Sequence, residues 1–366
     1  MRLKPRLLVV TPDYPPSRGG IQLLMQRLAE GLTGFETRVV TLSPSEAPAD
    51  TWDAVHVRRV TRPRGGQPAA VAAMSGRAVA DAIRFRPDVV LCGHVVASPA
   101  AFAVRRLTGA PVLLYLHAAE LGLRRGLSRF AVRRADLNVA VSRHTRELAL
   151  GLGAPSERVR LISPGVDLPP DADRTGDTEP IVVTVASLDY RYKGHDVLCR
   201  ALPLVSARVP GVRWVVIGDG SLRAHLEQLA RANGLNGDVS FLGRVDDAER
   251  DEWLRRATVF AMPSRLPPDG AGGEGFGIAF MEASSHGLPV VAGAVGGALD
   301  AVVDGETGIL VDPTDHVSVA DAIATLLLDR EKARALGEGG LRRAREFSWA
   351  RATENLETAL LELTAA

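Results

Sequence analysis

The chain has 366 residues, more than one ordinary hydrophobic core holds, and suits two domains of about 150–200 residues each. Charged residues make up 24% and apolar residues 46%, and a net charge of +1 gives no reason to expect nucleic acid or an acidic polymer as a partner. Two cysteines are too few for a thiolate metal cluster and fit a reducing compartment. The apolar run at 7–10 is too short for a signal peptide, so we expect a cytoplasmic protein.

The first half of the chain alternates short β-branched runs with longer helical patterns, which is typical of a parallel α/β sheet. Strands are expected at 6–10, 37–42, 55–60, 89–92, 112–117 and 137–141. Helices are expected at about 21–31 and 71–84, and from Ser142 onward. Residues 164–179, rich in Pro, Gly and acids, have the composition of a linker.

The second half repeats this alternation. Strands are expected at 181–185, 213–217, 239–242, 259–262, 289–292 and 308–311, and helices at 222–232, 247–256 and 317–327. The segment 331–363 is mostly helical in pattern, with breaks expected at Gly339-Gly340 and near 347–349. We therefore predict two doubly wound, Rossmann-like domains, 1–168 and 169–346, around a central cleft.

Two loops of the first domain follow carboxyl ends of strands, where parallel sheets bind ligands. Gly19 and Gly20 precede a helix, so the backbone there can approach a phosphate, although a turn without a ligand explains them equally well. His117 ends a strand, with Glu120 three residues later, and could bind a sugar hydroxyl. A histidine that merely caps a strand end is the more common arrangement. A metal site at His117 would need two or three further ligands in register, and none is evident in the sequence.

Similar loops occur in the second domain. Lys193 and Arg191 follow the strand 181–185 and could neutralise a diphosphate, although a solvated lysine is the ordinary alternative. Gly218 follows the next strand, and Arg223 lies one turn into the helix after it, which gives either a plain turn or another cation for phosphates. Gly296-Gly297 forms one more loop in which the backbone can be approached closely.

The segment from Glu274 to Glu282 carries the most information. If it is helical after Gly275, its two acids lie roughly 12 Å apart, about the distance from a sugar ring across a diphosphate to a ribose. The helix start between them would offer N–H groups to the phosphates. Glu282 could be an ordinary exposed acid, but its apolar flanks indicate a buried one, which needs a partner. The segment predicts a nucleotide-sugar site.

In their order and spacing, these loops resemble those of retaining glycosyltransferases of the GT-B fold, in the large family 4 that uses activated sugar nucleotides. The resemblance covers essentially the whole chain and rests on 11–20, His117, 164–167, 193–194, 218–220, 241–245, 262–265, 274–282, 296–297, 305–308 and 347–349. It implies the two Rossmann-like domains and a terminal helix, 347–366, that returns to the first domain.

The resemblance also implies roles for individual residues. The catalytic residues would be His117 near the anomeric centre of the donor sugar, Lys193 on the departing diphosphate, and Glu274 on the sugar hydroxyls. The donor-binding positions would be Gly19, Gly20, Arg191, Gly218, Arg223, Arg244, Gly275, Phe276, Gly277, Ile278 and, on the ribose, Glu282. No metal and no cofactor besides the donor itself is implied.

One position departs from the family pattern. Ser187 occupies the place of an arginine that usually binds the diphosphate, which should weaken stabilisation of the leaving group. We hypothesise that Arg191 compensates for this loss.

The loop from Asp13 to Gln22 is most similar to mannosyltransferases that act on phosphatidylinositol mannosides. We therefore expect transfer of a hexosyl unit, with mannosyl favoured, from a nucleoside diphosphate sugar (GDP-mannose or a UDP-sugar) to an acceptor hydroxyl, with a glycolipid as one candidate acceptor. The alternatives are a UDP-sugar donor with a soluble natural-product or aminocyclitol acceptor, and a non-catalytic sugar-nucleotide binding protein. The basic amphipathic stretch from Leu121 to Arg134 could dock peripherally on anionic lipid at the inner membrane face, or be a solvated or packed helix.

Overall fold

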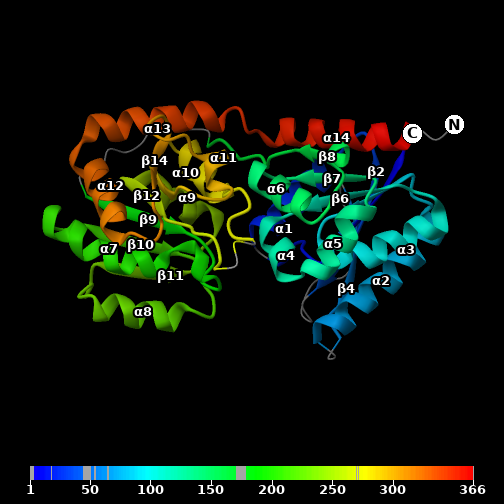
Figure 1. The fold of residues 1–366 in the computed structure, drawn as a ribbon, viewed down its shortest axis with the longest axis horizontal. Coiled ribbons are helices and arrows are strands. Elements are labelled where there is room, and N and C mark those ends of the chain that lie inside the picture. Colours follow the sequence, from blue (N-terminus) through cyan, green and yellow to red (C-terminus); the bar gives the residue numbers. More distant parts are fainter. Residues whose placement is uncertain are drawn as a thin grey trace. The chain divides into compact units, whose positions relative to one another are not determined.

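The chain divides into two compact units, which we call unit 1 (Met1–Gly165 and Trp349–Ala366) and unit 2 (Val166–Ser348). The computed structural model describes residues 4–17, 19–43, 51–52, 55–63, 66–169, 179–268, 270 and 272–365 (Figure 1). Arg18 in the first loop and residues 170–178 of the predicted linker lie outside the described residues. The domain boundaries predicted from the sequence are 168/169 and 346/347.

Unit 1 is built on a sheet with the strand order β3-β4-β2-β1-β5-β6-β7-β8. Its strands are β1 (Arg6–Thr11), β2 (Glu36–Ser43), β3 (Thr51–Trp52), β4 (His56–Thr61), β5 (Val89–Cys92), β6 (Val112–Leu116), β7 (Leu137–Ala140) and β8 (Val159–Leu161). The β3–β4 pair is antiparallel, whereas the other neighbours are parallel. The chain winds outward from β1 to β2 and then returns to β5 on the other side of β1. The loops after β1 and β5 therefore lie at a topological switch point, where such sheets bind ligands.

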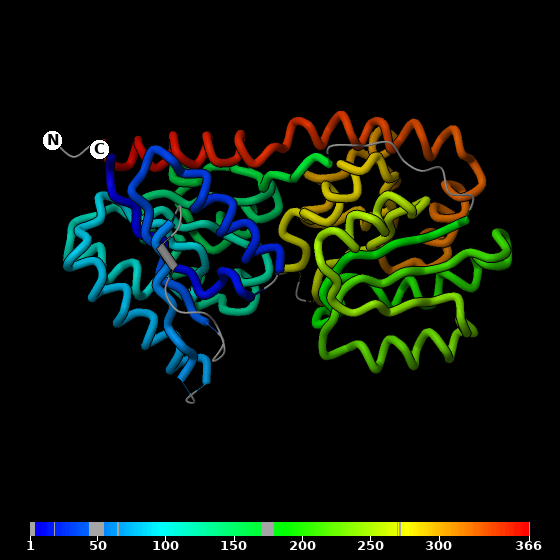
Figure 2. The backbone as a smooth tube through the Cα atoms, turned by 180° about the vertical axis from the view of Figure 1, so that it is seen from behind, coloured from blue at the N-terminus to red at the C-terminus, as the bar shows by residue number. Residues whose placement is uncertain are grey.

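The helices of unit 1 include one from the far end of the chain. They are α1 (Gly20–Gly31), α2 (Gly66–Phe85), α3 (Ser98–Thr108), α4 (Ala118–Leu123), α5 (Arg125–Arg134), α6 (Arg143–Gly151) and α14 (Trp349–Ala365), with 3₁₀ turns η1 (Val95–Ala97) and η2 (Ser156–Arg158). Leu356 and Leu360 of α14 are fully buried. A Cβ on Gly31 of α1 would lie 2.8 Å from the Thr353 hydroxyl oxygen of α14, so the two helices pack closely (Figure 2).

Unit 2 has a parallel sheet with the order β11-β10-β9-β12-β13-β14. Its strands are β9 (Ile181–Val185), β10 (Arg213–Ile217), β11 (Val239–Gly243), β12 (Val259–Met262), β13 (Val290–Gly293) and β14 (Gly308–Val311). Its helices are η3 (Arg191–Lys193), α7 (His195–Arg208), α8 (Arg223–Ala232), α9 (Asp247–Arg256), α10 (Ile278–Ser285), α11 (Ala298–Ala301), α12 (His316–Leu328) and α13 (Arg330–Ala344). Here the winding reverses between β9 and β12.

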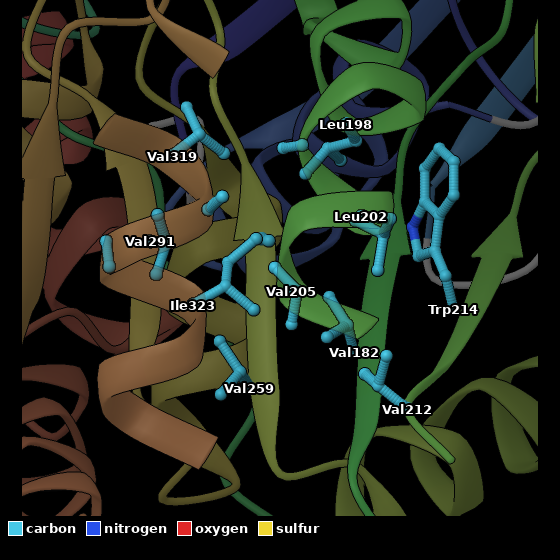
Figure 3. Close-up of a cluster of buried hydrophobic side chains, with 14 of the residues drawn as sticks. Val182, Leu198, Leu202, Val205, Val212, Trp214, Val259, Val291, Val319 and Ile323 are labelled. Atoms are coloured by element: carbon cyan, nitrogen blue, oxygen red, sulfur yellow. The ribbon is translucent and has the colours of Figure 1, made fainter. Parts of the chain in front are cut away.

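The core of unit 2 explains why its strands read as unbroken apolar runs. Side chains of α7 and α12, such as Leu202 and Ile323, pack against Val182 of β9 in a fully buried cluster (Figure 3). Each such side chain contributes about 1.5–3 kcal/mol by burial. The indole N–H of buried Trp214 donates to the Thr184 hydroxyl at 3.0 Å, and this hydroxyl donates to the Ala261 carbonyl at 2.6 Å. The polar atoms in this core are therefore paired across three strands.

The predicted two-domain α/β architecture is confirmed, and each predicted strand overlaps an observed one. Strands β3 and β8 were not predicted. The predicted helix break at Gly339-Gly340 is wrong, because α13 runs through it. A Cβ on Gly339 would lie 2.0 Å from the Glu306 carbonyl oxygen, so this glycine permits close packing rather than a bend. Within the described residues, no helix combines the length and apolar character needed to cross a membrane.

Candidate active site

The candidate residues follow carboxyl ends of strands in both units. In unit 1, Gly19 lies between β1 and α1, and His117 lies between β6 and α4. In unit 2, Lys193 lies between β9 and α7, Glu274 between β12 and α10, and Gly218 between β10 and α8. Because β9 and β12 flank the switch point of unit 2, Lys193 and Glu274 occupy the place where a doubly wound sheet is expected to bind a ligand.

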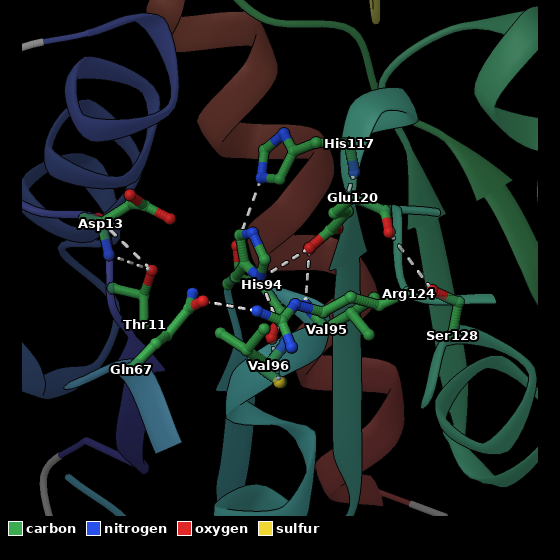
Figure 4. Close-up of polar contacts among 12 residues, drawn as sticks. Thr11, Asp13, Gln67, His94, Val95, Val96, His117, Glu120, Arg124 and Ser128 are labelled. Carbon is green, nitrogen blue, oxygen red and sulfur yellow. Dashed lines mark hydrogen bonds and ion pairs between the residues drawn. The ribbon is translucent and has the colours of Figure 1, made fainter. Parts of the chain in front are cut away.

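In unit 1, one buried carboxylate joins the ends of two neighbouring strands (Figure 4). Glu120 Oε1 accepts the His117 backbone N–H at 3.0 Å, and Oε2 accepts the Val95 N–H at 2.7 Å. The same Oε2 lies 2.8 Å from His94 Nδ1. The His117 ring in turn places Nε2 3.2 Å from the Gly93 carbonyl. Since a carbonyl only accepts, His117 carries its proton on Nε2.

The charges in this cluster are set by burial and by Glu120. Burial lowers the pKa of His117, so its ring is neutral at physiological pH. Burial also opposes a charge on His94, but the Glu120 carboxylate outweighs it and raises the pKa of His94. Burial alone would raise the pKa of Glu120, whereas His94 and His117 together hold it below its usual range. Glu120 therefore remains ionised, with His94 Nδ1 beside its carboxylate.

The loop after β1 is ordered by short polar contacts. The Asp13 backbone N–H donates to the Thr11 hydroxyl at 3.1 Å, and Gln22 donates to the Asp13 carboxylate at 2.8 Å. Gly19 is the N-cap of α1, with Gly20 as the first helical residue. The first N–H groups of this helix have no intrahelical acceptor and point toward the loop, as a phosphate site requires.

In unit 2, Lys193 and Glu274 form an ion pair with an Nζ–Oε2 distance of 2.6 Å. The two side chains are 17% and 12% exposed, so the pair is largely shielded from water. Burial lowers the pKa of Lys193, but Glu274 and Tyr192 raise it more, which keeps the ammonium charged. An ammonium has three donors, and Glu274 uses one of them. The other donors suit phosphate oxygens.

The segment from Glu274 to Glu282 corrects one expectation. The helix begins at Ile278 rather than after Gly275, because Gly277 is its N-cap in a left-handed conformation with φ 90°. The separation estimated from a continuous helix therefore does not apply. A Cβ on Gly297 would lie 2.2 Å from the Gly275 carbonyl oxygen, and the Gly297 N–H donates to the Glu274 carbonyl at 3.0 Å. The two glycine loops thus pack directly on each other.

The predicted partner for the buried acid Glu282 exists. Arg250 of α9 places Nη1 3.5 Å from Glu282 Oε1 and also pairs with Asp247 and Asp251. Burial raises the pKa of Glu282, and Arg250 opposes this rise. No sequence pattern indicated Arg250, which lies on a different helix among other charged residues. His94 was also missed, although its place just after β5 at a strand end could have indicated it.

The remaining cations predicted to bind the donor differ in their surroundings. Arg223 donates to the Phe241 carbonyl at 2.8 Å and to Glu227 at 2.9 Å, which ties it to strand β11. Arg244 is exposed, and its charge is one of the smaller causes that lower the pKa of Asp189. A Cβ on Gly218, at φ 142°, would lie 1.9 Å from the Ala186 carbonyl, so only glycine fits there.

Ser187 and Arg191 have separate neighbours. The Ser187 hydroxyl donates to Asp189 at 2.9 Å, and Asp189 also accepts the Ser221 N–H at 2.8 Å. Arg191 is exposed and lines a cavity of about 270 Å³ together with side chains of α7 and α8. Among the described residues, no three His, Cys, Asp or Glu side chains are gathered to hold a metal ion.

Comparison with known proteins agrees with this geometry. The model for Glycosyltransferase Family 4 matches residues 18–169, and that for Glycosyl transferases group 1 matches residues 170–343. A GDP-mannose-dependent alpha-(1-6)-phosphatidylinositol monomannoside mannosyltransferase of Mycobacterium tuberculosis is 34% identical over 362 residues, which cover 92% of each chain.

Solved structures match over nearly the whole chain. Sucrose-phosphate synthase from Thermosynechococcus elongatus has a TM-score of 0.87 at 22% identity and covers 99% of this chain and 100% of its own. HepE from Anabaena, in complex with UDP-glucose, has a TM-score of 0.79 at 22% identity, with coverage of 98% and 99%. The fold is thus GT-B.

The chain belongs to the family 4 glycosyltransferases, the group 1 glycosyl transferases. It is accordingly a glycosyltransferase that acts on a sugar-nucleotide donor.

Proposed function

We propose that this enzyme transfers a mannosyl unit from GDP-mannose to a hydroxyl of a glycolipid acceptor, with retention of anomeric configuration. The observation that carries the donor site is the buried Lys193–Glu274 pair at the switch point of unit 2. The mannosyl choice is supported by the 34% identical relative, which is named as a GDP-mannose-dependent mannosyltransferase. A UDP-sugar donor with a soluble acceptor is the second candidate, and HepE, solved with UDP-glucose, favours it.

The proposed mechanism uses charge rather than a carboxylate nucleophile. Lys193 stabilises the departing diphosphate, together with the N–H groups at 276–278 that open α10. Glu274 holds sugar hydroxyls, and Glu282 accepts hydrogen bonds from the ribose. His117 contacts the sugar near its anomeric carbon. The leaving group departs and the acceptor hydroxyl enters on the same face of the sugar, so no metal or additional cofactor takes part in the proposal.

A panel of nucleotides tests the donor assignment. GDP and GDP-mannose should raise the melting temperature more than UDP, ADP and their hexose conjugates, because only a ligand bound to the folded state stabilises it. Lys193→Ala should abolish most of this rise and lower kcat by about 10²–10³-fold. Lys332→Ala, on the exposed start of α13, is the matched control. Stabilisation by none of the nucleotides would overturn the donor site, and preference for UDP would favour the second candidate.

Arg191 is proposed to supply the cation that Ser187 does not. Arg191→Ala should then lower turnover with donor and acceptor, and Ser187→Arg should restore it in the Arg191→Ala background. Unchanged turnover in Arg191→Ala would end this part of the proposal.

A peripheral lipid contact is proposed at α4 and α5. The stretch predicted from Leu121 to Arg134 forms these two helices, and Ala131 and Val132 face the core. Leu123 is 76% exposed, and the arginines of the stretch (Arg124, Arg125, Arg129, Arg133 and Arg134) are exposed. Basic side chains around an exposed apolar one suit an anionic bilayer surface.

Co-sedimentation with vesicles tests this contact. Phosphatidylglycerol vesicles should retain the protein at low salt, and Leu123→Asp should release it. Leu328→Asp, on a leucine of unit 2 that is 59% exposed, should not. Equal retention on phosphatidylcholine would remove the electrostatic basis of the proposal.

A further inference from the structure

Glu120 and His94 make contacts that the proposed reaction does not use. The β5–β6 ladder stops at the pair Cys92–Leu114, so β5 and β6 are not paired with each other beyond it. Beyond that pair, the Glu120 carboxylate links the two segments by hydrogen bonds. One oxygen accepts the His117 N–H at the end of β6, and the other accepts the Val95 N–H beyond β5. The His117 ring closes the link from the other side through the Gly93 carbonyl.

We propose that Glu120 and His94 are positioning residues, which fix His117 by joining the ends of β5 and β6. The inference rests on the proposed contact of His117 with the donor sugar. Because His117 is tied at both its backbone N–H and its ring Nε2, a loss of the Glu120 bond would let the backbone of His117 move while the ring stayed attached to Gly93. A displacement of that kind changes the direction of the ring toward its substrate.

His94 stabilises the ionised form of the Glu120 carboxylate, which accepts these hydrogen bonds. Glu120 is 4% exposed, and an unpaired charge at that depth would be costly. His94 Nδ1 lies 2.8 Å from Glu120 Oε2 and 3.1 Å from the Val96 nitrogen, so it either donates to the carboxylate or accepts the Val96 N–H. The carboxylate favours the protonated form of His94. The other charged groups that act on His94 are Asp13, which favours its charge, and Arg124, which opposes it.

A double-mutant cycle tests whether Glu120 acts through His117. Glu120→Gln keeps the shape but replaces one acceptor oxygen by an amide that donates, so one backbone N–H faces another donor. We expect kcat to fall about 10–100-fold, because small misplacements of a reacting group cost that much, with the donor KM changed by less than about 3-fold. In a His117→Ala background, Glu120→Gln should cause no further loss. Glu147→Gln, on exposed α6, is the control.

A pH profile tests His94 independently of Glu120. In the unsubstituted enzyme, kcat should decline as the pH rises through the raised pKa of His94, because its neutral form no longer supports the Glu120 charge. His94→Gln still donates a hydrogen bond but does not titrate, so this alkaline decline should disappear. A purely structural role would lower the melting temperature without moving the profile.

The outcomes separate this inference from the proposed function. If His117→Ala keeps full activity, the proposed role of His117 is wrong. If His117→Ala lowers kcat and the losses from His117→Ala and Glu120→Gln multiply in the double variant, the positioning role is wrong and the site stands. Persistence of the alkaline decline in His94→Gln, or a Glu120→Gln effect confined to KM, would likewise overturn the positioning role.

Discussion

At the scale of single residues, the proposed donor site of unit 2 contains an acid, Glu282, whose pKa is raised by burial. Glu282 has apolar neighbours in α10, and its cation partner Arg250 is shared with Asp247 and Asp251. Burial raises the pKa of Glu282, and the nearby acids add to this, against the effect of Arg250. The charge that would bind ribose hydroxyls is therefore easily lost on acidification.

The pH profile of the donor KM should accordingly show an acid limb, in which KM rises at low pH. Below its raised pKa, Glu282 is protonated and becomes a weaker acceptor, so the donor KM should rise as the pH falls toward this pKa. Arg250→Gln removes the charge that lowers the pKa of Glu282, and should move the limb to higher pH. Steady-state kinetics from about pH 5 to 8 measure this shift. Arg231→Gln, exposed on α8, should leave the limb in place, and a limb at the same pH in Arg250→Gln would contradict the assignment.

At the scale of elements, the loops after β9 and β12 are shaped by glycines that allow backbones to touch. Gly194 has φ 83°, and a Cβ there would lie 2.2 Å from the Pro263 carbonyl oxygen. This contact joins the Lys193 loop to the loop that leads to Glu274. The 2.6 Å ion pair therefore rests on a backbone contact that no other residue type permits.

Gly194→Ala should consequently damage both stability and catalysis. Gly211 offers a matched control, since it has φ 80° but no atom within 4 Å of an added Cβ. Gly211→Ala should cost about 1–2 kcal/mol, for the left-handed conformation alone. Gly194→Ala should cost more and also lower kcat, because Pro263 and Lys193 must move apart. Denaturant unfolding and turnover measure the two effects, and equal losses in both variants would show that the contact with Pro263 is unimportant.

The sequence predicted the strands well because many of them are apolar runs buried on both faces, such as Ile181–Val185, whereas β4 and β11 are only partly buried. It failed where tertiary contacts override local signals. Gly339 and Gly340 suggested a helix break, but they serve a close approach to neighbouring backbone and side chains. Gly277 delays the start of α10, because its left-handed conformation is not helical. A pattern of residue types does not reveal that conformation. In the site, Lys193 and Glu274 were predictable from their places after strands, whereas Arg250 was not, because its contact depends on how α9 packs.

At the scale of the whole molecule, unit 1 is assembled from both ends of the chain. Helix α14 follows unit 2 in sequence but buries Leu356 and Leu360 in unit 1, where Gly31 and Thr353 bring α1 and α14 together. Loss of buried leucines of this kind costs about 2–5 kcal/mol each. Unit 2, by contrast, is one continuous stretch, Val166–Ser348.

The two units should therefore behave differently when they are expressed alone. A fragment of residues 166–348 should unfold cooperatively, whereas residues 1–165 should be poorly stable or aggregate, because the surface covered by α14 is exposed. Joining residues 349–366 to residue 165 through a flexible linker should restore cooperative unfolding. Circular dichroism during heating measures both, and a fragment 1–165 as stable as the joined form would show that α14 adds little.

The position of α14 also sets an order of events during synthesis. Domains usually fold as units while the chain emerges, with the N-terminal one first. Unit 1 cannot complete its folding in that way, because the ribosome must synthesise all of unit 2 before α14 appears. The surface that α14 later covers is thus open to chaperones throughout the synthesis of unit 2, and a ribosome that stops short of Trp349 leaves unit 1 without its last helix.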